Sequence, residues 1–260
     1  MIDIHNHLLY GLDDGAETLE ESVEMCRISF NDGVRIIVAT PHTLNYVYEN
    51  SRATILAKVQ ELNGILIPKV FPAAIPSPAN HENLKIIPGA DVFFSEEVLS
   101  EHARGNITTV ADGGKFLLLE FPSWGIPLQA EAVLFQLLVR KITPIITHPE
   151  RNLEIIHSQK KYTDMILMGC LGQITAQSLT GDFGRDARQA AEKLLRKNLV
   201  HFIASDGHSA NGRPPVLSSG VRAAAKIVGE EEARKMVTEY PQAIIEGRRP
   251  DVPEPRDSFR

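Results

Sequence analysis

The chain has few cysteines, few cations and no long apolar run, and each shortage excludes a class of protein. Its 260 residues include two cysteines, so no disulfide framework is expected, and a reducing cytoplasm fits. No apolar run is long enough to span a membrane, and we expect neither membrane insertion nor a signal peptide. Lysine and arginine number 27 against 33 acidic residues, and this net charge of −6 argues against nucleic-acid binding. These features predict a cytoplasmic globular protein.

Apolar runs of strand length alternate with segments of helical periodicity. The expected strands are residues 2–7, 34–39, 85–94, 116–121, 142–147, 171–176 and 200–204. The expected helices are one that Thr18 caps and Gly33 ends, then 51–62, 129–140, 162–168, 185–197, 216–228 and 230–245. This alternation predicts a parallel α/β fold of barrel type in one domain, residues 1–247, followed by a polar, proline-rich tail, 248–260. The prolines of segment 67–88 predict an irregular crossover.

The first strand carries a His-x-His pair. Ile2 and Ile4 alternate with polar residues, and side chains two apart on a strand point the same way, so His5 and His7 share a face. Two imidazoles on one face can hold a divalent metal ion. The pattern is common, and its significance here depends on the polar residues that end later strands.

Histidines and carboxylates recur at or near the ends of the other apolar runs. In a parallel barrel these strand ends meet at one mouth, so we expect the side chains to converge. Glu120 lies in an otherwise apolar strand, where a metal ion or a buried arginine is needed to satisfy it. The candidate ligands are His5, His7, Asp14, His42, Asp91, Glu120, His148, Asp206 and His208. This number suits two or three divalent ions, and mixed imidazole and carboxylate ligation is compatible with manganese, iron or zinc.

The order of these motifs resembles the PHP (polymerase and histidinol phosphatase) superfamily, and within it the CpsB/CapC/YwqE group. The resemblance covers about residues 1 to 245. The motifs that carry it are Ile2-Asp3-Ile4-His5-Asn6-His7, Leu12-Asp13-Asp14-Gly15, Trp124-Gly125-Ile126-Pro127, Thr147-His148-Pro149-Glu150-Arg151-Asn152, Ser205-Asp206-Gly207-His208 and Gly212-Arg213-Pro214-Pro215. Each motif alone is weak, and their combination is specific.

The resemblance implies a distorted seven-stranded β/α barrel with three metal sites. Carried over residue by residue, the first site takes His5, His7, Asp91 and Asp206. The second takes Asp91, Glu120 and His148, with Asp91 bridging, and the third takes Asp14, His42 and His208. The group usually has glutamate where this chain has Asp91, which is shorter by one methylene group.

The resemblance also implies an activity, the metal-dependent hydrolysis of phosphotyrosine on protein. A hydroxide bridging the metal ions, most often Mn²⁺, would attack phosphorus while Arg151 and Arg213 grip the phosphate oxygens. Both arginines could instead form surface ion pairs. Asp206 or His208 could donate a proton to the leaving group. The implied partner is a bacterial tyrosine kinase with a tyrosine-rich tail that acts in capsule or exopolysaccharide synthesis.

Three other functions remain open at this point. Two are a small-molecule phosphatase, such as a histidinol-phosphate phosphatase, and a polymerase-associated exonuclease, which the acidic net charge disfavours. The third is a regulatory binding module without catalysis, against which the retained ligand residues argue. A cysteine-based phosphatase is excluded, because the Cys-x5-Arg motif it needs is absent: Asp32 and Ala176 stand six residues after Cys26 and Cys170.

Overall fold

Two parallel sheets form the centre of the protein, in a computed structural model that describes residues 1–70 and 84–256. The strands are β1 (Ile2–Asn6), β2 (Ile36–Ala39), β3 (His42–Thr43), β4 (Lys85–Pro88), β5 (Asp91–Phe93), β6 (Phe116–Glu120), β7 (Thr143–Thr147), β8 (Leu171–Thr175) and β9 (Phe202–Ala204). The helices are α1 (Leu19–Asn31), α2 (Arg52–Val70), α3 (Val98–Ala103), α4 (Ala130–Val139), α5 (Leu153–His157), α6 (Lys160–Met168), α7 (Ala176–Thr180), α8 (Arg185–Arg196), α9 (Ser218–Val228), α10 (Glu230–Lys235) and α11 (Glu239–Ile245), with 3₁₀ turns η1 (Val110–Asp112) and η2 (Pro149–Arg151).

The predicted parallel α/β fold is confirmed, and the number of strands differs from the predicted seven. Within the described residues one sheet has the order β1-β2-β4 and the other the order β3-β5-β6-β7-β8-β9. The extra strands arise from two breaks at one level, Thr40-Pro41 before β3 and Gly89-Ala90 before β5. Pro41 has no N–H for the ladder, and Gly89 lies so close to β2 that an added Cβ would come within 2.5 Å of Val38.

The first and last strands of the chain lie side by side. The His7 amide donates to the Gly207 carbonyl (2.9 Å), and the Asp206 amide donates to the His5 carbonyl (2.9 Å). Beneath them Asp3 is fully buried and accepts hydrogen bonds from the Ser205 amide (3.0 Å) and hydroxyl (2.5 Å). This junction brings the His-x-His pair beside the loop that follows β9.

Two predicted helices have different bounds in the structure. The helix expected at 51–62 continues to Val70, so the irregular crossover predicted for 67–88 begins later than expected, and its last residues form β4 (Lys85–Pro88). The helix expected at 230–245 is divided into α10 and α11. Pro241 lies in the first turn of α11, where its missing N–H is tolerated, so the helix restarts just before it. The rest of the predicted crossover, residues 71–83, lies outside the described residues.

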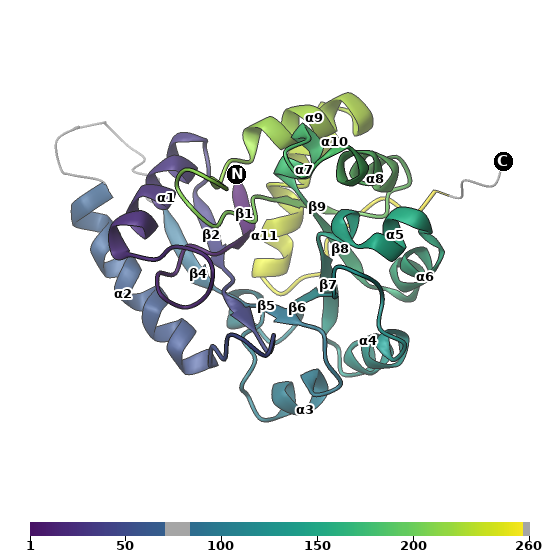
Figure 1. Cartoon of the computed structure of the whole chain (residues 1–260), viewed down its shortest axis with the longest axis horizontal. Coiled ribbons are helices and arrows are strands. Elements are labelled where there is room, and N and C mark those ends of the chain that lie inside the picture. The colour runs from purple at the N-terminus through teal and green to yellow at the C-terminus, as the bar shows by residue number, and fades with distance from the viewer. Residues whose placement is uncertain (71–83, 257–260) are drawn as a thin grey trace.

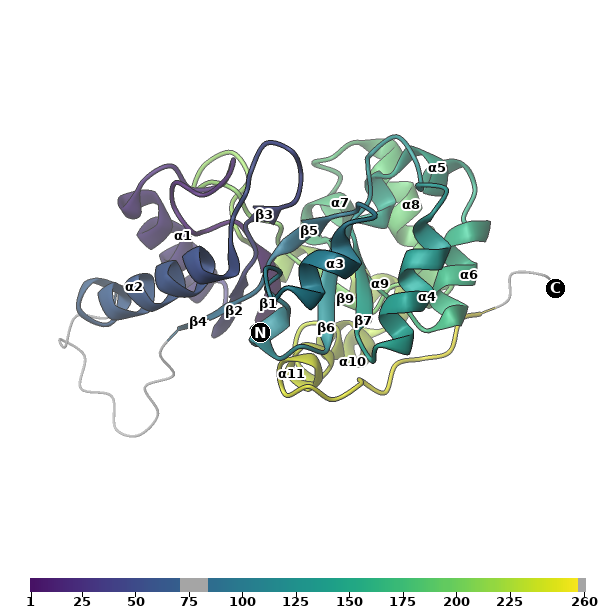
Figure 2. The same cartoon turned by 90° about the horizontal axis from the view of Figure 1, so that it is seen from below.

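The helices surround the strands, and the C-terminal segment runs along one end of them (Figures 1 and 2). Apolar strand side chains such as Ile37, Leu117 and Ile203 are fully buried in one core. Residues 248–256 are docked: Arg249 donates to the Gly169 carbonyl (3.1 Å), and the Arg256 amide to the Lys197 carbonyl (2.9 Å). The predicted boundary between domain and tail stays a prediction. Over residues 1–70 and 84–256, no helix has the length and apolarity to cross a membrane.

Candidate metal centre

His5 and His7 meet at the end of β1. Both side chains are fully buried, and their Nε2 atoms are 3.0 Å apart, so the two imidazoles share a face as the spacing predicts. Asp206 approaches from the loop after β9, with Oδ1 at 3.4 Å from each Nε2 atom. These three side chains form one group that could hold a metal ion.

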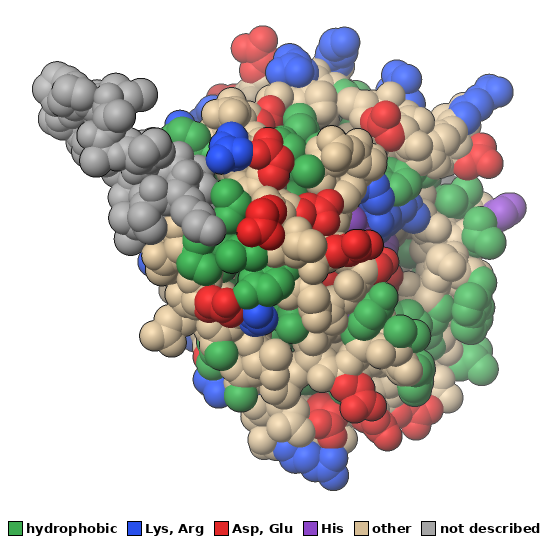
Figure 3. All heavy atoms as spheres, turned by 60° about the vertical axis from the view of Figure 1, so that its left-hand side comes forward, with side chains coloured by type: hydrophobic (Ala, Val, Ile, Leu, Met, Phe, Trp, Pro, Cys, Tyr) green, Lys and Arg blue, Asp and Glu red, His purple; other side chains and the backbone are tan. Residues whose placement is uncertain are grey.

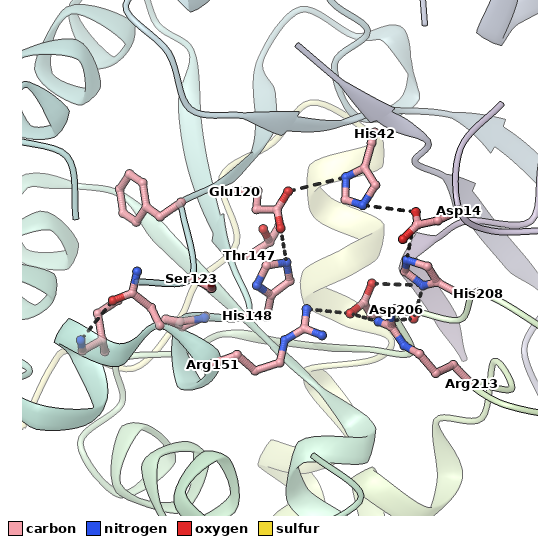
Figure 4. A pocket seen from close by; sticks show the side chains of 14 residues that line it. Asp14, His42, Glu120, Ser123, Thr147, His148, Arg151, Asp206, His208 and Arg213 are labelled. Carbon is pink, nitrogen blue, oxygen red and sulfur yellow. Dashed lines mark hydrogen bonds and ion pairs between the residues drawn. The ribbon is translucent and has the colours of Figure 1, made fainter. Parts of the chain in front are cut away.

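Two further groups adjoin the first. The structure brings together His42, Asp91 and Glu120, and also His7, Asp14, His42 and His208. His148 belongs to no group, yet its Nε2 atom lies 3.5 Å from Glu120 Oε1 and 3.9 Å from Asp91 Oδ2. All nine predicted ligands therefore converge on one region (Figure 4 labels six of them). His102, His157 and His201 take no part in these groups.

The structure groups the nine ligands differently from the three metal sites that the resemblance implies. His7 is shared between the first and third groups, and His42 is shared between the second and third. Asp91 is outside the first group but lies near it, with Oδ2 at 3.5 Å from His5 Nε2. The same nine side chains thus form a continuous cluster. Their assignment to individual ions stays a prediction.

Two atoms at the centre of the cluster test whether it fits a cation. Asp91 Oδ2 and His42 Nδ1 are both buried without a hydrogen-bond partner, and they lie 3.5 Å apart. Buried polar atoms are normally satisfied, and an unpaired carboxylate oxygen is costly. A divalent cation between these atoms would satisfy both. The residues present therefore fit a metal ion.

The histidines are held mainly in the neutral form that binds metals. Burial lowers the pKa of His5 to about 3, of His42 to about 4 and of His208 to about 2, and it lowers that of His148 well below the usual value. His7 is the exception. Burial lowers its pKa too, but the neighbouring Asp13 and Asp206 outweigh burial and bring it to about 10. A metal ion at His7 Nε2 would have to displace a proton.

The carboxylates repel one another in the absence of a cation. Burial and the nearby charge of Glu120 raise the pKa of Asp91, while burial and Asp206 raise that of Glu120 to about 7. Burial also tends to raise the pKa of Asp206, but Arg151 and His5 hold it well below its usual range. A cluster of this charge has a strong affinity for cations.

Backbone strain occurs at two of the ligands. His148 (φ 34°) and Asp206 (φ 51°) are non-glycine residues in the left-handed region, and each comes directly or almost directly after a strand. This conformation is unfavourable for residues with a Cβ and is concentrated at functional sites. It turns both side chains back over the strand ends, toward the cluster.

Two residues that the sequence did not single out orient the histidines. Asp13 Oδ2 lies 2.7 Å from His7 Nδ1, and Gln173 Oε1 lies 2.9 Å from His5 Nδ1. Each contact leaves the Nε2 atom of its histidine free for a metal ion. A signal existed for Gln173, because a polar residue in a buried strand needs a partner. None distinguished Asp13 from the adjacent Asp14.

Arg151 and Arg213 lie beside the cluster. Their Nη2 atoms are 2.7 and 2.6 Å from the same oxygen, Asp206 Oδ2 (Figure 4). Ion pairing was the alternative role for these arginines, and they do pair, but with a candidate ligand and not with a surface carboxylate. Both arginine side chains are partly exposed, at 21% and 32%. They can therefore reach a bound anion.

A pocket of about 290 Å³ lies over the cluster, and the two arginines line it together with six of the nine ligands. Phe121, Ser123 and Ile155 line its other side. Acidic, basic and histidine side chains gather at a hollow on the face shown in Figure 3. A larger pocket, of about 790 Å³, has none of the nine ligands in its walls. The chemistry therefore points to the smaller pocket.

Clustered imidazole and carboxylate ligands at the ends of parallel strands, beside a cationic pocket, define a class: metal-dependent hydrolases on an α/β fold. Within this class the chain belongs to the capsular polysaccharide synthesis family CpsB/CapC, whose family model matches residues 1–246.

Relatives in this family are named as tyrosine phosphatases. Tyrosine-protein phosphatase YwqE of Bacillus subtilis is 36% identical over 213 residues, which are 82% of this chain and 79% of that protein. Tyrosine-protein phosphatase CpsB of Streptococcus agalactiae serotype III is 30% identical over 250 residues, 94% of this chain and 98% of that protein. A crystal structure from work on YwqE and Streptococcus pneumoniae CpsB, described as unique metal-dependent tyrosine phosphatases, matches with a TM-score of 0.91 and 32% identity over the whole of both chains.

A more distant likeness concerns the fold alone. The phosphotriesterase homology protein of Escherichia coli has a TM-score of 0.52 and 16% identity, covering 93% of this chain and 97% of that protein.

Proposed function

We propose that this protein is a metal-dependent phosphomonoesterase that hydrolyses phosphotyrosine on protein. The observation that carries the proposal is the placement of two arginines and six of the nine candidate metal ligands around one pocket. A phosphate dianion bound there would meet two guanidinium groups on one side and the ligand cluster on the other. The activity named for the family relatives is consistent with this arrangement.

The nine ligand residues would hold two or three divalent ions, for which we propose manganese, with iron or zinc as alternatives. Ions bound there would supply a nucleophilic oxygen at neutral pH and stabilise charge on the phosphoryl group. Asp91 would take the central position, since its Oδ2 atom is within 4 Å of His5, His42 and His148.

Arg151 and Arg213 would bind the phosphate oxygens that do not face the metal ions. A guanidinium group matches the geometry of phosphate and remains charged at all relevant pH values. Both side chains now donate to Asp206 Oδ2, and their remaining N–H groups can point into the pocket. Binding of the dianion would then add to these ion pairs, and Asp206 would keep the arginines beside the metal ligands.

Protonation of the leaving group by a separate general acid would contribute little to the rate of this reaction. The leaving group is a phenolate of unperturbed pKa about 10, which departs without full protonation. Asp206 is ionised because its pKa is held low, and the low pKa of His208, about 2, makes that side chain neutral. We therefore assign both residues to metal binding first and to proton transfer only after metal and substrate are bound.

The natural partner that we propose is a bacterial tyrosine kinase with a phosphorylated tyrosine-rich tail, acting in capsule or exopolysaccharide synthesis in the cytoplasm. The family description and the named relatives support this context. We also propose that the two sheets represent one distorted seven-stranded barrel. In this view β2 with β3, and β4 with β5, are interrupted strands, and β1 closes against the loop after β9.

The decisive measurement is phosphate release from a phosphotyrosine peptide, with Mn²⁺ present and after metal removal by a chelator. We expect release only with metal, and its loss in His148→Ala. His157→Ala is the matched control, because this exposed histidine lies outside the cluster. Histidinol phosphate serves as the competing substrate. No release from the peptide by a metal-loaded protein would refute the tyrosine-phosphatase function, and release from histidinol phosphate alone would establish the small-molecule alternative.

A further inference from the structure

Phe183 is an aromatic residue that the hydrophobic core does not explain. It lies in the turn between α7 and α8 and is the sole large apolar residue between Leu179 and Ala187. Its side chain is half-buried, but among the described residues it belongs neither to the core nor to the partly buried side chains packed against the core. Packing against the core therefore does not account for the position of this ring.

The ring of Phe183 faces both arginines of the pocket. The Cζ atom of Arg151 is 4.8 Å from the ring centroid, and that of Arg213 is 5.2 Å from it. Cations within about 6 Å of an aromatic face are attracted by the ring quadrupole, and arginine is the most frequent partner. Phe183 does not line the pocket itself, so its ring supports the guanidinium groups from behind.

The two arginines need such support because they come from different loops. Arg151 ends the turn η2 after β7, and Arg213 follows the loop after β9. Both donate to one oxygen, Asp206 Oδ2, so two like charges are held close together. Long side chains also lose conformational freedom when they bind an anion, and a group that orders them beforehand reduces this loss.

The turn that carries Phe183 is itself well fixed. Gly181 (φ 96°) and Gly184 (φ 89°) adopt left-handed conformations that favour glycine, and the Gly184 amide donates to the Gly181 carbonyl (2.9 Å). The preceding helix α7 is tied to the arginine loop by the buried Glu150, which accepts from the Ser178 hydroxyl (2.7 Å) and the Thr175 amide (2.9 Å). Glu150 immediately precedes Arg151, so the ring and this arginine share one rigid support.

We propose that Phe183 is a positioning residue that holds Arg151 and Arg213 side by side for binding the phosphate dianion. The inference rests on the proposed function in one respect: the ligand of the two arginines is a phosphoryl group. It adds a third loop to the phosphate site, through a residue that does not line the pocket and acts through the two arginines.

The test is the binding of inorganic phosphate to the metal-loaded full chain, measured by isothermal titration calorimetry with metal stoichiometric to the sites. Phe183→Leu keeps apolar bulk and removes the ring, and we expect phosphate binding about fivefold weaker. Phe183→Tyr keeps the aromatic face and should bind within about twofold of the original protein. The metal content of both variants should be unchanged, since the ring of Phe183 acts on the two arginines. Phe183→Met replaces the leucine variant if that variant does not fold.

A double-mutant cycle separates positioning from a general structural role. In a background with Arg151→Ala and Arg213→Ala, Phe183→Leu should have no further effect on phosphate binding, because the groups it orders are gone. An equal loss in that background, an unchanged affinity in the single variant, or a lower metal content would each overturn the proposal. The calorimetry requires no turnover. A protein that fails to hydrolyse phosphotyrosine but shows the expected cycle would therefore refute the proposed function and support the role of Phe183.

Discussion

The carboxylate of Asp13 lies 2.7 Å from Nδ1 of His7, and the same oxygen accepts a hydrogen bond from the His42 amide at 2.9 Å. One buried side chain thus fixes the ring of one candidate ligand and the backbone of another. Its second oxygen accepts from the Gly15 amide (2.9 Å), which holds the loop that carries Asp14. Asp13 therefore organises three ligands without being one of them.

Asp13→Asn should weaken metal binding and leave the fold intact. An asparagine oxygen is a poorer acceptor than a carboxylate, and it orients His7 less firmly, an effect that typically costs about 10- to 100-fold in metal affinity. Competition with a chelator of known affinity measures the loss. Asp164→Asn, at an exposed position on α6, is the control. An affinity equal to that of the unchanged protein would show that His7 does not depend on Asp13.

Asp91→Asn should have opposite effects on the two forms of the protein. Without metal, the substitution removes a buried carboxyl whose pKa is raised by burial and by Glu120, so folding no longer requires its protonation, and we expect stabilisation of about 1 kcal/mol, or about 2–4 °C in Tm. With metal, the loss of a central ligand should lower both the metal content and the stabilisation that metal gives. Thermal unfolding with and without Mn²⁺ tests both effects. A lower Tm for the variant in the metal-free state would contradict this account of the cluster.

Metal affinity should fall as the pH falls through about 7. The pKa of Glu120 is raised to about 7 by burial and by Asp206, so below this pH a proton must leave the carboxyl before it can bind a cation. The stability of the metal-free protein should depend on pH in the opposite direction and fall as the pH rises. A carboxyl whose pKa is raised on folding contributes stability below its unfolded pKa, and this contribution is lost as the pH rises through 7.

The matched comparison for this pH effect is Glu120→Gln, which cannot titrate. From pH 5 to pH 8, the Tm of the metal-free original protein should fall relative to the Tm of this variant. Calorimetric titration of metal at pH 6, 7 and 8 should show proton release that the variant lacks at this site. A pH-independent difference in Tm would mean that Glu120 keeps an ordinary pKa.

Asp3→Ala should destabilise the fold and weaken the metal centre together. The side chain is fully buried and accepts hydrogen bonds from Ser205 and from Asn6 Nδ2 (3.0 Å). Its removal leaves these donors unsatisfied, at a cost of about 2–4 kcal/mol, which corresponds to about 5–15 °C in Tm. Asp164→Ala should change Tm by less than about 2 °C. Unaltered stability of Asp3→Ala would show that the junction of β1 with β9 is held by its backbone alone.

Much of the site follows from the sequence because most of the ligands stand at or near the end of an apolar run. His42, His148 and Asp206 come just after β2, β7 and β9, and parallel strands require their carboxyl ends to lie at one edge. This rule predicts convergence but gives no distances. The sharing of His42 between two groups therefore could not be foreseen.

What the sequence did not predict depends on contacts between distant segments. The break between β4 and β5 depends on the approach of Gly89 to Val38, and the support of the arginines depends on Phe183, from a loop with no recognisable motif. Asp13 and Asp14 are adjacent and chemically alike, and only the folded chain directs one to His7 and the other to His208. Such distinctions require coordinates.

The pairing of β1 with the segment after β9 also determines when the metal centre can form. His5 and His7 leave the ribosome before the other ligands, while Asp206, His208 and Arg213 follow only after most of the other strands and helices have been made. Until then the two early histidines lack their neighbours, and a chain cut short before Ser205 has no complete site. The metal centre therefore cannot assemble before residue His208 has been synthesised.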